Sequence, residues 1–320
     1  MKTKAMLSAL ALAMLGNFAH ADQYYLNLSA AVTSQDPMVI AMEAAAERIA
    51  ERTDGQMTVR VFPSSQLGSD EDVIEQIRSG ANIGILVDAG RLSQYKSELG
   101  ILSAPYLVDD YTQYEQITSS DLYLQWVEDL ADDSGLRLLN YNWFQGSREM
   151  LTKEPVEGPD DLRGVRVRTI NSPVWMSTIR DMGATPTPLP WTEVYSALQL
   201  GSIDGAEAQL TAAEGQNLHE VVNHIALTGH IQLLTGIATS EEWYQGLPSD
   251  FREIVYEELL AAGEEASQAT VDALDAVRAR MEDAGVTFRD VDIDVFRDRV
   301  SGVYEELGYD QYRDELTSGL

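Results

Sequence analysis

The order of strands and helices in the sequence predicts an α/β fold with two domains. Short apolar strands alternate with amphipathic helices twice, first in residues 24–87 and again in residues 136–207. This alternation builds a parallel sheet with helices on its faces. Removal of a 21-residue leader leaves 299 of the 320 residues, enough for two ordinary domains that each have a core.

The first unit is predicted from its turn and capping signals. A strand begins near Tyr24, and Ser34-Gln-Asp-Pro37 then opens a helix with a capping side chain and a proline in the first turn. Thr53-Asp54-Gly55 ends this helix, and apolar residues alternate with polar ones in the strand of residues 57–61. Ser69 and Asp72 fit a capping box for the next helix.

A buried strand over residues 83–87 completes the first unit, and its end is a candidate ligand position. Ligands of open α/β sheets lie beyond the carboxyl ends of the strands. Asp88 falls at such an end, and so does the loop that begins at Pro63. We therefore expect the cleft to lie beside these loops.

A second unit of the same kind follows Gly135. The segment Ile225–Ser240 is apolar and rich in threonine, as a strand that crosses back to the first domain would be, and Leu247-Pro-Ser-Asp250 opens a long helical tail. The sequence also predicts strands over residues 136–143, 165–169, 185–189 and 202–207, with helices that start at Asn171-Ser-Pro173 and at Thr192.

The N-terminus has the pattern of a secretory signal peptide, residues 1–21. Two lysines precede an apolar run from Ala5 to Leu15, and Ala19-His20-Ala21 matches the small-x-small pattern of a cleavage site. The alternative is a membrane anchor, but the run is well short of the roughly 20 residues that a spanning helix needs. We expect cleavage before Asp22, export to the periplasm and no stable membrane insertion afterwards.

The chain carries a large excess of acids. Its formal charge is −30, from 52 acidic and 22 basic residues, and becomes −32 when Lys2 and Lys4 leave with the leader. Such a surface disfavours nucleic acid and anionic membranes as partners. We interpret it as adaptation to a salty exterior that screens the self-repulsion. The chain has no cysteine, which excludes disulfides and thiol chemistry.

Four blocks of the sequence together resemble the solute-binding subunits of tripartite ATP-independent periplasmic (TRAP) transporters, the DctP family. The resemblance extends over nearly the whole mature chain. The blocks are Phe62-Pro-Ser-Ser-Gln-Leu67-Gly68 with Gly80, Trp143-Phe-Gln-Gly146-Ser-Arg148, Gly164-Val-Arg-Val-Arg168-Thr-Ile-Asn171-Ser-Pro173, and the run from Pro190-Trp191 to Asp204-Gly205-Ala-Glu207.

The resemblance implies a two-domain periplasmic binding protein-like fold with a ligand cleft between the domains. It further implies crossing strands, closure on the solute, and a hinge-spanning C-terminal helix near Glu253–Glu282. We expect domain I to comprise residues 22–145 plus 234–273, and domain II residues 146–233 plus 274–320.

Two arginines are the main candidates for binding an anion. Arg168 ends a predicted strand and is expected to hold a carboxylate by two parallel hydrogen bonds, as the resemblance implies. The alternative for Arg168 is a salt bridge with a surface acid. The resemblance implies that Arg148 is a second basic contact to the solute. The alternative for Arg148 is an ion pair that stabilises the hinge. Arg166 is expected to serve structure or face solvent.

Four other residues are candidate ligand contacts, each with a plainer alternative. Asn171 offers its amide to the ligand or caps the helix that follows it. Trp191 forms an aromatic wall, as the resemblance implies, or packs in the core. Asp88 and Asp70 lie on first-domain loops, where their carboxylates accept hydrogen bonds from the ligand or remain exposed surface acids.

The segment around Glu207 is implied to be hinge architecture. Asp204-Gly205 is predicted as a turn, and Glu207 resembles a glutamate of the family. Ala208 departs from the family pattern because it replaces a polar side chain that can reach the ligand. Gln209 is the candidate substitute for that side chain, and the choice between a dicarboxylate-type and a sialate-type site stays open.

The inventory of motifs disfavours an enzyme. The sequence lacks a P-loop, a His-Glu-x-x-His motif and a Gly-x-Ser-x-Gly elbow, so an exported hydrolase would need a catalytic pair that is not recognisable. The spacing of His219, His224 and His230 favours structural roles over a metal site. We expect no cofactor and no metal.

The expected function is that of a monomeric receptor that delivers a small organic anion to TRAP membrane permease subunits. A periplasmic sensor subunit that passes solute binding to a membrane receptor kinase is the alternative. A dicarboxylate, a sugar acid or a keto acid would each suit Arg168, and the resemblance also admits zwitterionic solutes.

Overall fold

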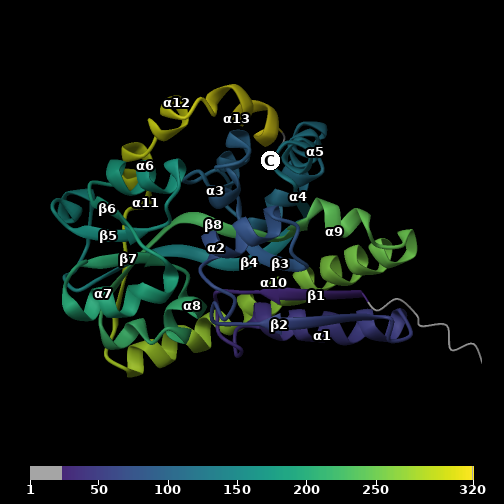
Figure 1. Cartoon of the computed structure of the whole chain (residues 1–320). Coiled ribbons are helices and arrows are strands. Elements are labelled where there is room, and N and C mark those ends of the chain that lie inside the picture. Colours follow the sequence, from purple (N-terminus) through teal and green to yellow (C-terminus); the bar gives the residue numbers. More distant parts are fainter. Residues whose placement is uncertain (1–23, 319) are drawn as a thin grey trace, which may run out of the picture.

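The computed structural model describes residues 24–318 and 320, so the predicted signal peptide lies outside the described residues. Two α/β domains lie side by side, and strands run from one into the other (Figure 1). One continuous sheet has the strand order β2-β1-β3-β8-β4-β7-β5-β6, and β9 pairs with β8. The predicted fold class, α/β with two domains and crossing strands, is confirmed.

The first domain is built on three parallel strands with helices on both faces. β1 lies in the middle and pairs in parallel with β2 and β3. The capping signals act as predicted, because Asp36 accepts a hydrogen bond from the Met38 amide and Ser69 accepts one from the Asp72 amide. The elements are β1 (Tyr24–Ser29), α1 (Pro37–Arg52), β2 (Met57–Phe62), α2 (Asp70–Arg78), β3 (Ile83–Asp88), α3 (Ala89–Leu92), α4 (Tyr114–Thr118), α5 (Asp121–Ser134) and α9 (Glu241–Gln245).

The second domain repeats this arrangement with shorter strands. β5 lies in the middle and pairs in parallel with β6 and β7. The last predicted strand starts later than expected, at Gly205, because residues 202–204 form the turn that precedes it. The elements are β5 (Arg166–Thr169), α6 (Pro173–Asp181), β6 (Thr185–Pro188), α7 (Val194–Leu200), β7 (Gly205–Ala208), α8 (Leu210–Gly215), β9 (Thr287–Asp290) and α11 (Ile293–Arg299).

Two long antiparallel strands, β4 (Leu136–Thr152) and β8 (His224–Ser240), join the domains. Their pairing is irregular at several points between Leu138 and Met150, where the strands pass from one domain to the other. A close approach explains Gly236, since a Cβ there would lie 2.0 Å from the Asn140 carbonyl oxygen. The sequence had predicted β4 only as far as Trp143.

Helix α10 (Ser249–Asp283) spans both domains, as expected. Its 35 residues give a length of about 50 Å at the usual rise per residue. The helix packs on α1 and β4 of the first domain and on α8 of the second. Side chains fasten it to the crossing strand, because the Asn142 amide donates to the Leu260 carbonyl and the Ser267 hydroxyl accepts from the Phe144 amide.

The C-terminal helices α12 (Val303–Glu306) and α13 (Asp310–Thr317) cross the molecule on the side opposite to α10 (Figure 1). The Tyr304 hydroxyl donates to the Pro105 carbonyl of the first domain at 2.8 Å, while Glu306 accepts from Ser177 of the second. The tail therefore contacts both domains. The predicted assignment of residues 274–320 to one domain remains a prediction.

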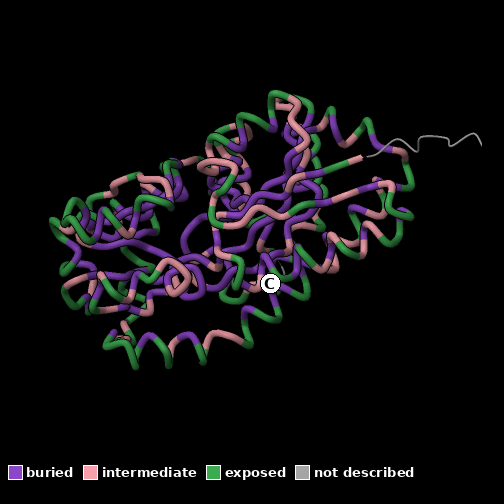
Figure 2. The backbone as a smooth tube through the Cα atoms, turned by 60° about the horizontal axis from the view of Figure 1, so that its bottom comes forward, coloured by how far each residue is buried: buried purple, intermediate pink, exposed green. Residues whose placement is uncertain are grey.

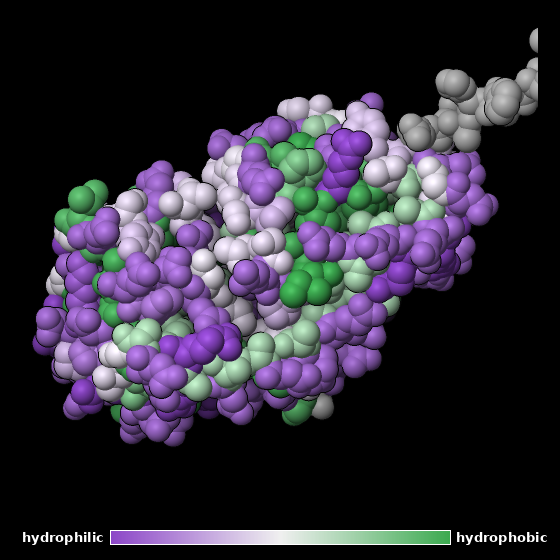
Figure 3. Space-filling model, turned by 90° about the horizontal axis from the view of Figure 1, so that it is seen from below, coloured by the Kyte–Doolittle hydropathy of each residue, from purple (hydrophilic) through white to green (hydrophobic). Residues whose placement is uncertain are grey.

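The core lies on both faces of the sheet. In β3 the side chains of Ile83, Ile85 and Val87 join one buried cluster, and Leu86 joins the other, as strand alternation requires. Figure 2 shows buried strands inside and exposed turns along the outer helices. Hydrophilic residues cover much of the face in Figure 3. No helix within residues 24–318 is both long and apolar enough to cross a bilayer.

Candidate functional site

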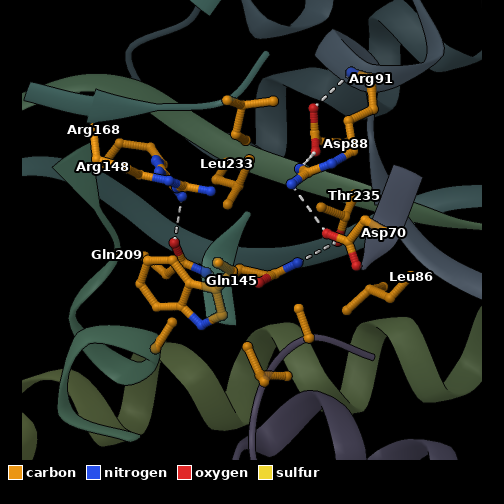
Figure 4. Close-up of a pocket in the computed structure, with 15 residues that line it drawn as sticks. Asp70, Leu86, Asp88, Arg91, Gln145, Arg148, Arg168, Gln209, Leu233 and Thr235 are labelled. Atoms are coloured by element: carbon orange, nitrogen blue, oxygen red, sulfur yellow. Dashed lines mark hydrogen bonds and ion pairs between the residues drawn. The ribbon is translucent and has the colours of Figure 1, made fainter. Parts of the chain in front are cut away.

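A small cavity lies between the two domains at the carboxyl ends of their strands (Figure 4). Its volume, as the space open to the centres of water-sized molecules, is about 60 Å³. Both domains and both crossing strands contribute to its walls. The lining residues are Ala31, Val32, Asp70, Leu86, Asp88, Arg91, Gln145, Arg148, Arg168, Ile170, Trp191, Gln209, Ala212, Leu233 and Thr235.

Three of the eight polar lining residues stand at strand ends, which explains why distant parts of the sequence meet here. Asp88 is the last residue of β3, Arg168 is the third residue of β5, and Gln209 follows β7 directly. Because parallel strands end at the same edge of a sheet, the loops after them converge there. The loops of the two half-sheets face each other across the crossing strands.

Arg168 is a buried cation without an acidic partner in the described chain. Its side chain is 1% exposed, its Nε donates to the Leu189 carbonyl at 2.9 Å, and its guanidinium lies 5.3 Å from the ring centre of Trp191. No carboxylate of residues 24–318 forms an ion pair with it. The pKa of Arg168 is lowered to about 10, mainly by burial and also by the charges of Arg148 and Arg91, while Glu207 and Asp70 oppose this shift. An anion in the cavity would compensate the positive charge of Arg168.

Arg148 lies beside Arg168 in the cavity, but it is already paired. Its guanidinium contacts the carboxylate of Glu207, donates to the Glu207 carbonyl at 2.5 Å and donates to the Gln209 side chain at 2.6 Å. It also stacks on Trp175, 4.8 Å from the ring centre. This arrangement is the ion pair weighed as the alternative for Arg148, and it still leaves Arg148 on the cavity wall.

The first-domain wall is built around Arg91, which contacts three carboxylates. Its three guanidinium nitrogens lie 3.0 Å from Glu71, 2.5 Å from Asp88 and 3.1 Å from Asp70. Asp88 also caps α3, because its other oxygen accepts from the Arg91 amide at 2.9 Å. Burial raises the pKa of Asp70, while Arg91 opposes this shift. Both acids predicted at the cleft thus line the cavity as parts of one network.

A chain of hydrogen bonds runs from Arg148 through Gln209 to the crossing strands. Gln209 accepts from Arg148 and donates to Gln145 at 2.8 Å, and Gln145 donates to the Thr235 hydroxyl at 3.1 Å. Thr235 donates in turn to the Trp143 carbonyl. Each amide therefore has a fixed orientation, so the cavity presents polar groups that are ordered in advance.

Glu207 and Gly205, the residues expected to serve the hinge, lie on β7 beside the crossing strand β4, and their hinge role stays a prediction. Glu207 is fully buried, holds Arg148 and accepts from the Thr169 hydroxyl at 3.0 Å. Gly205 begins β7 so close to β4 that a Cβ would lie 2.7 Å from the Leu151 carbonyl oxygen. A side chain at residue 205 would therefore displace the crossing strand.

Asn171 is the predicted site residue that does not line the cavity. Its side chain is exposed, and its carbonyl accepts from Gln94 at 3.0 Å. The N-cap of α6 is Ser172, so Asn171 does not occupy the capping position either. Its ligand contact stays a prediction that gains no support from this placement.

Sequence reasoning missed three polar residues of the cavity, namely Arg91, Gln145 and Thr235. The position of Arg91 three residues after Asp88 was the available signal, because a basic residue one helical turn after a capping acid can reach it. Gln145 lies inside a block that carried the family resemblance. Thr235 had no local signal, since it lies in the middle of an apolar strand.

The three histidines in the described part of the chain are not among the residues that line the cavity. His230 is fully buried, its Nδ1 lies 2.8 Å from the Thr228 hydroxyl, and burial lowers its pKa to about 3. His219 and His224 belong to the second domain. In the part of the chain that the structure describes, no group of three or more histidine, cysteine, aspartate or glutamate side chains is arranged to hold a metal ion.

Comparison with known proteins shows relatives along almost the whole chain. The family model described as "bacterial extracellular solute-binding protein, family 7" (DctP) matches residues 28–311. The ectoine-binding periplasmic protein TeaA of Halomonas elongata is 29% identical over 78% of this chain and 75% of its own.

Two solved structures of TRAP periplasmic solute-binding proteins are also similar. The apo open structure from Escherichia fergusonii is 38% identical, with a TM-score of 0.81 over 93% of this chain and 100% of that one. The structure from Ochrobacterium anthropi with bound L-fuconate is 30% identical, with a TM-score of 0.89 over 92% and 100%. The chain belongs to the DctP family and is a TRAP transporter solute-binding subunit.

Proposed function

We propose that this chain is a non-catalytic periplasmic receptor that captures a small organic acid between its domains and delivers it to a TRAP permease. The observation that carries the proposal is the buried guanidinium of Arg168, which has no acid beside it in the described chain. A carboxylate can take two parallel hydrogen bonds from an arginine, and closure strengthens them by excluding water. Arg148 supports the same anion from the crossing strand β4.

Domain closure is part of the proposal. The TM-score is higher to the fuconate-bound relative than to the apo open relative, although the open relative has the higher sequence identity. This order supports a closed arrangement of the domains, which agrees with the small cavity. Only a closed receptor presents both domain surfaces together, so closure can signal the loaded state to the permease.

Organic acids that carry hydroxyl groups suit the cavity better than organic acids without them. Beyond the two arginines, its walls hold the ordered amides of Gln145 and Gln209 and the hydroxyl of Thr235. These groups already bond to one another, but each keeps further donor or acceptor positions that the hydroxyls of a solute can fill and an aliphatic chain cannot. The fuconate-bound relative makes a sugar acid the first candidate, and the ectoine-binding relative makes a zwitterion the second.

A ligand screen on the mature chain, residues 22–320, tests the proposal. The panel comprises sugar acids, keto acids, dicarboxylates and ectoine, and the readout is thermal unfolding followed by calorimetry. A solute at 100 times its Kd should stabilise the protein by about 2.7 kcal/mol. We expect at least one organic acid to do so, and R168M to abolish the effect. Stabilisation by no acid, or equal stabilisation of R168M, would overturn the proposal.

Four further parts of the proposal have separate tests. Mass spectrometry of the exported protein should show a new N-terminus at Asp22. Light scattering should show a monomer both with and without solute. Uptake of the solute by membrane vesicles that contain the permease should depend on the added receptor. If uptake does not depend on the receptor but the activity of a receptor kinase does, the sensor alternative is favoured. A bound solute should be recovered unchanged.

A further inference from the structure

The cavity wall that the first domain forms contains a charged cluster that the binding of an anion at Arg168 does not require. Arg91 lines the cavity and is buried, yet each of its guanidinium nitrogens already meets a carboxylate, from Asp70, Glu71 and Asp88. It is therefore unable to act as a further free cation for the solute. The cluster of these four residues, which we name the Arg91 cluster, is an acidic wall with a cation inside it.

The two ends of the cavity carry opposite net charge. The Arg91 cluster joins one cation to three acids, which leaves two negative charges when all are ionised. The opposite wall contains Arg148, which pairs with Glu207, and the unpaired Arg168, so one positive charge is left there. Figure 4 shows the two groups on opposite sides of the cavity. A solute that spans the cavity therefore meets a cationic end and an anionic end.

Asp70 is the member of the Arg91 cluster best placed to meet the solute. Both carboxylate oxygens of Asp88 are engaged, one by the Arg91 amide and one by its guanidinium. Asp70 uses only Oδ2, at 3.1 Å from Arg91, and no group of the described chain donates to its Oδ1. Its side chain is only 11% exposed and lies on the cavity wall. Oδ1 is thus an acceptor on the cavity wall that remains open to a donor from the solute.

We propose that the Arg91 cluster makes this receptor select solutes with a single carboxylate and with hydroxyl or ammonium donors at the opposite end. This inference rests on the proposed function, because it requires the carboxylate to lie at Arg168. A hydroxyl or an ammonium group satisfies Oδ1 of Asp70. A second carboxylate brings a like charge to an acidic wall with little water to screen it, so dicarboxylates of the same length are rejected.

Matched pairs of acids test this inference on the intact mature receptor. Galactonate and galactarate have the same six carbons, and they differ only in a terminal hydroxymethyl group against a terminal carboxylate. Threonate and tartrate form the same pair with four carbons, and this second length is included because the closed cavity is small. Calorimetry at one pH and salt concentration gives Kd for each. We expect the monoacid of the better-fitting pair to bind at least 100-fold more tightly than its diacid.

The variant D70N tests the cause, since asparagine keeps the shape of the side chain and removes its charge. We expect the ratio between diacid and monoacid Kd to fall at least tenfold. D72N is the control, because Asp72 is an exposed acid on the same helix and its loss removes the same charge. D72N should leave the ratio unchanged.

The outcomes separate the two proposals. Tight binding of both acids of a pair by the wild-type protein, or an unchanged ratio in a folded D70N, overturns the inference while leaving the receptor function intact. A failure of every acid to bind, or binding that survives R168M, overturns the proposed function instead. The wild-type ratio needs no variant, so an equal Kd for the two acids refutes the inference even if D70N fails to fold.

Discussion

Two buried arginines line the same cavity from opposite domains, Arg168 on β5 and Arg91 on α3. Arg91 meets three carboxylates, whereas Arg168 forms no ion pair with any residue of the described chain. Their pKa values shift in opposite directions, because burial lowers that of Arg168 while the surrounding acids of Arg91 outweigh burial and raise it.

The difference separates a structural arginine from a binding one. A buried cation that is fully paired holds its neighbours in place and has little left for a ligand. A buried cation without an acid is unfavourable until an anion arrives, so the free energy lost in folding is recovered on binding. Residue type and burial are the same in the two cases, and only the surrounding charges distinguish them.

The same substitution at the two arginines should therefore have different effects on stability, and R91M gives the larger one. Loss of Arg91 leaves Asp70 and Asp88 buried without their cation, so we expect the free energy of unfolding to fall by about 3–5 kcal/mol. Denaturant unfolding of the ligand-free protein measures this. R78M is the control, because Arg78 is a half-exposed arginine that pairs with Glu75 on the same helix. A loss no larger than that of R78M would refute the structural role of Arg91.

R168M should reverse the pattern, with a loss of binding and no loss of stability. Removal of two charge-assisted hydrogen bonds should weaken binding by about 3 kcal/mol or more, which is at least about 100-fold in Kd. The ligand-free variant should unfold at the same denaturant concentration as the wild type or at a higher one, because a buried unpaired cation is gone. A variant that loses stability as R91M does would show that Arg168 serves the fold.

Glu149 extends the comparison to an unpaired buried acid near the hinge. Its carboxylate accepts from the Gly229 amide at 2.7 Å, and burial raises its pKa from 4.5 to about 8. The folded state thus holds this proton more tightly than the unfolded state does, so stability falls as pH rises from 4.5 towards 8. Between pH 6.5 and 8 the decline should be about 1–2 kcal/mol. His230, whose pKa is lowered to about 3, acts mainly below this window.

E149Q should remove this decline, because the amide keeps an acceptor for Gly229 and has no proton to lose. Unfolding curves of the variant and the wild type at pH 6.5 and pH 8 provide the measurement. E51Q, at an exposed position of α1, is the control and should keep the wild-type slope. An E149Q slope equal to that of the wild type would mean that Glu149 is already ionised at pH 6.5.

The sequence predicted the elements that have local signals. Asp36 and Ser69 cap the predicted helices, and α10 covers the predicted tail. Only the first half of β4 was predicted. The residues beyond Trp143 include Gln145, Ser147 and Arg148, which break the apolar pattern of a buried strand. Those polar residues are tolerated because the strand crosses the interdomain region there.

Residues of the candidate site were predictable where the type and the position of a single residue indicate its role. Arg168, Arg148, Asp70, Asp88, Trp191 and Gln209 all line the cavity, and three of them, Asp88, Arg168 and Gln209, stand at strand ends. Pairing was not predictable, because it depends on side chains that are distant in sequence. Arg91 meets Asp70 across 21 positions, and Arg148 meets Glu207 across 59. Asn171 follows its strand closely but lies outside the cavity, because a helix start turns it towards solvent.

Arg166 provides the smallest expected effect and the sharpest control for Arg168, since both belong to β5. Its guanidinium is 44% exposed and pairs with Asp204 at 2.8 Å. An exposed pair in water contributes little to stability, because solvent and salt screen it. R166M should therefore leave Kd for the solute unchanged, and it should shift the unfolding midpoint less than R91M does. If R166M weakened binding as strongly as R168M, general loss of positive charge would explain both results, and the unpaired state of Arg168 would not be the cause of binding.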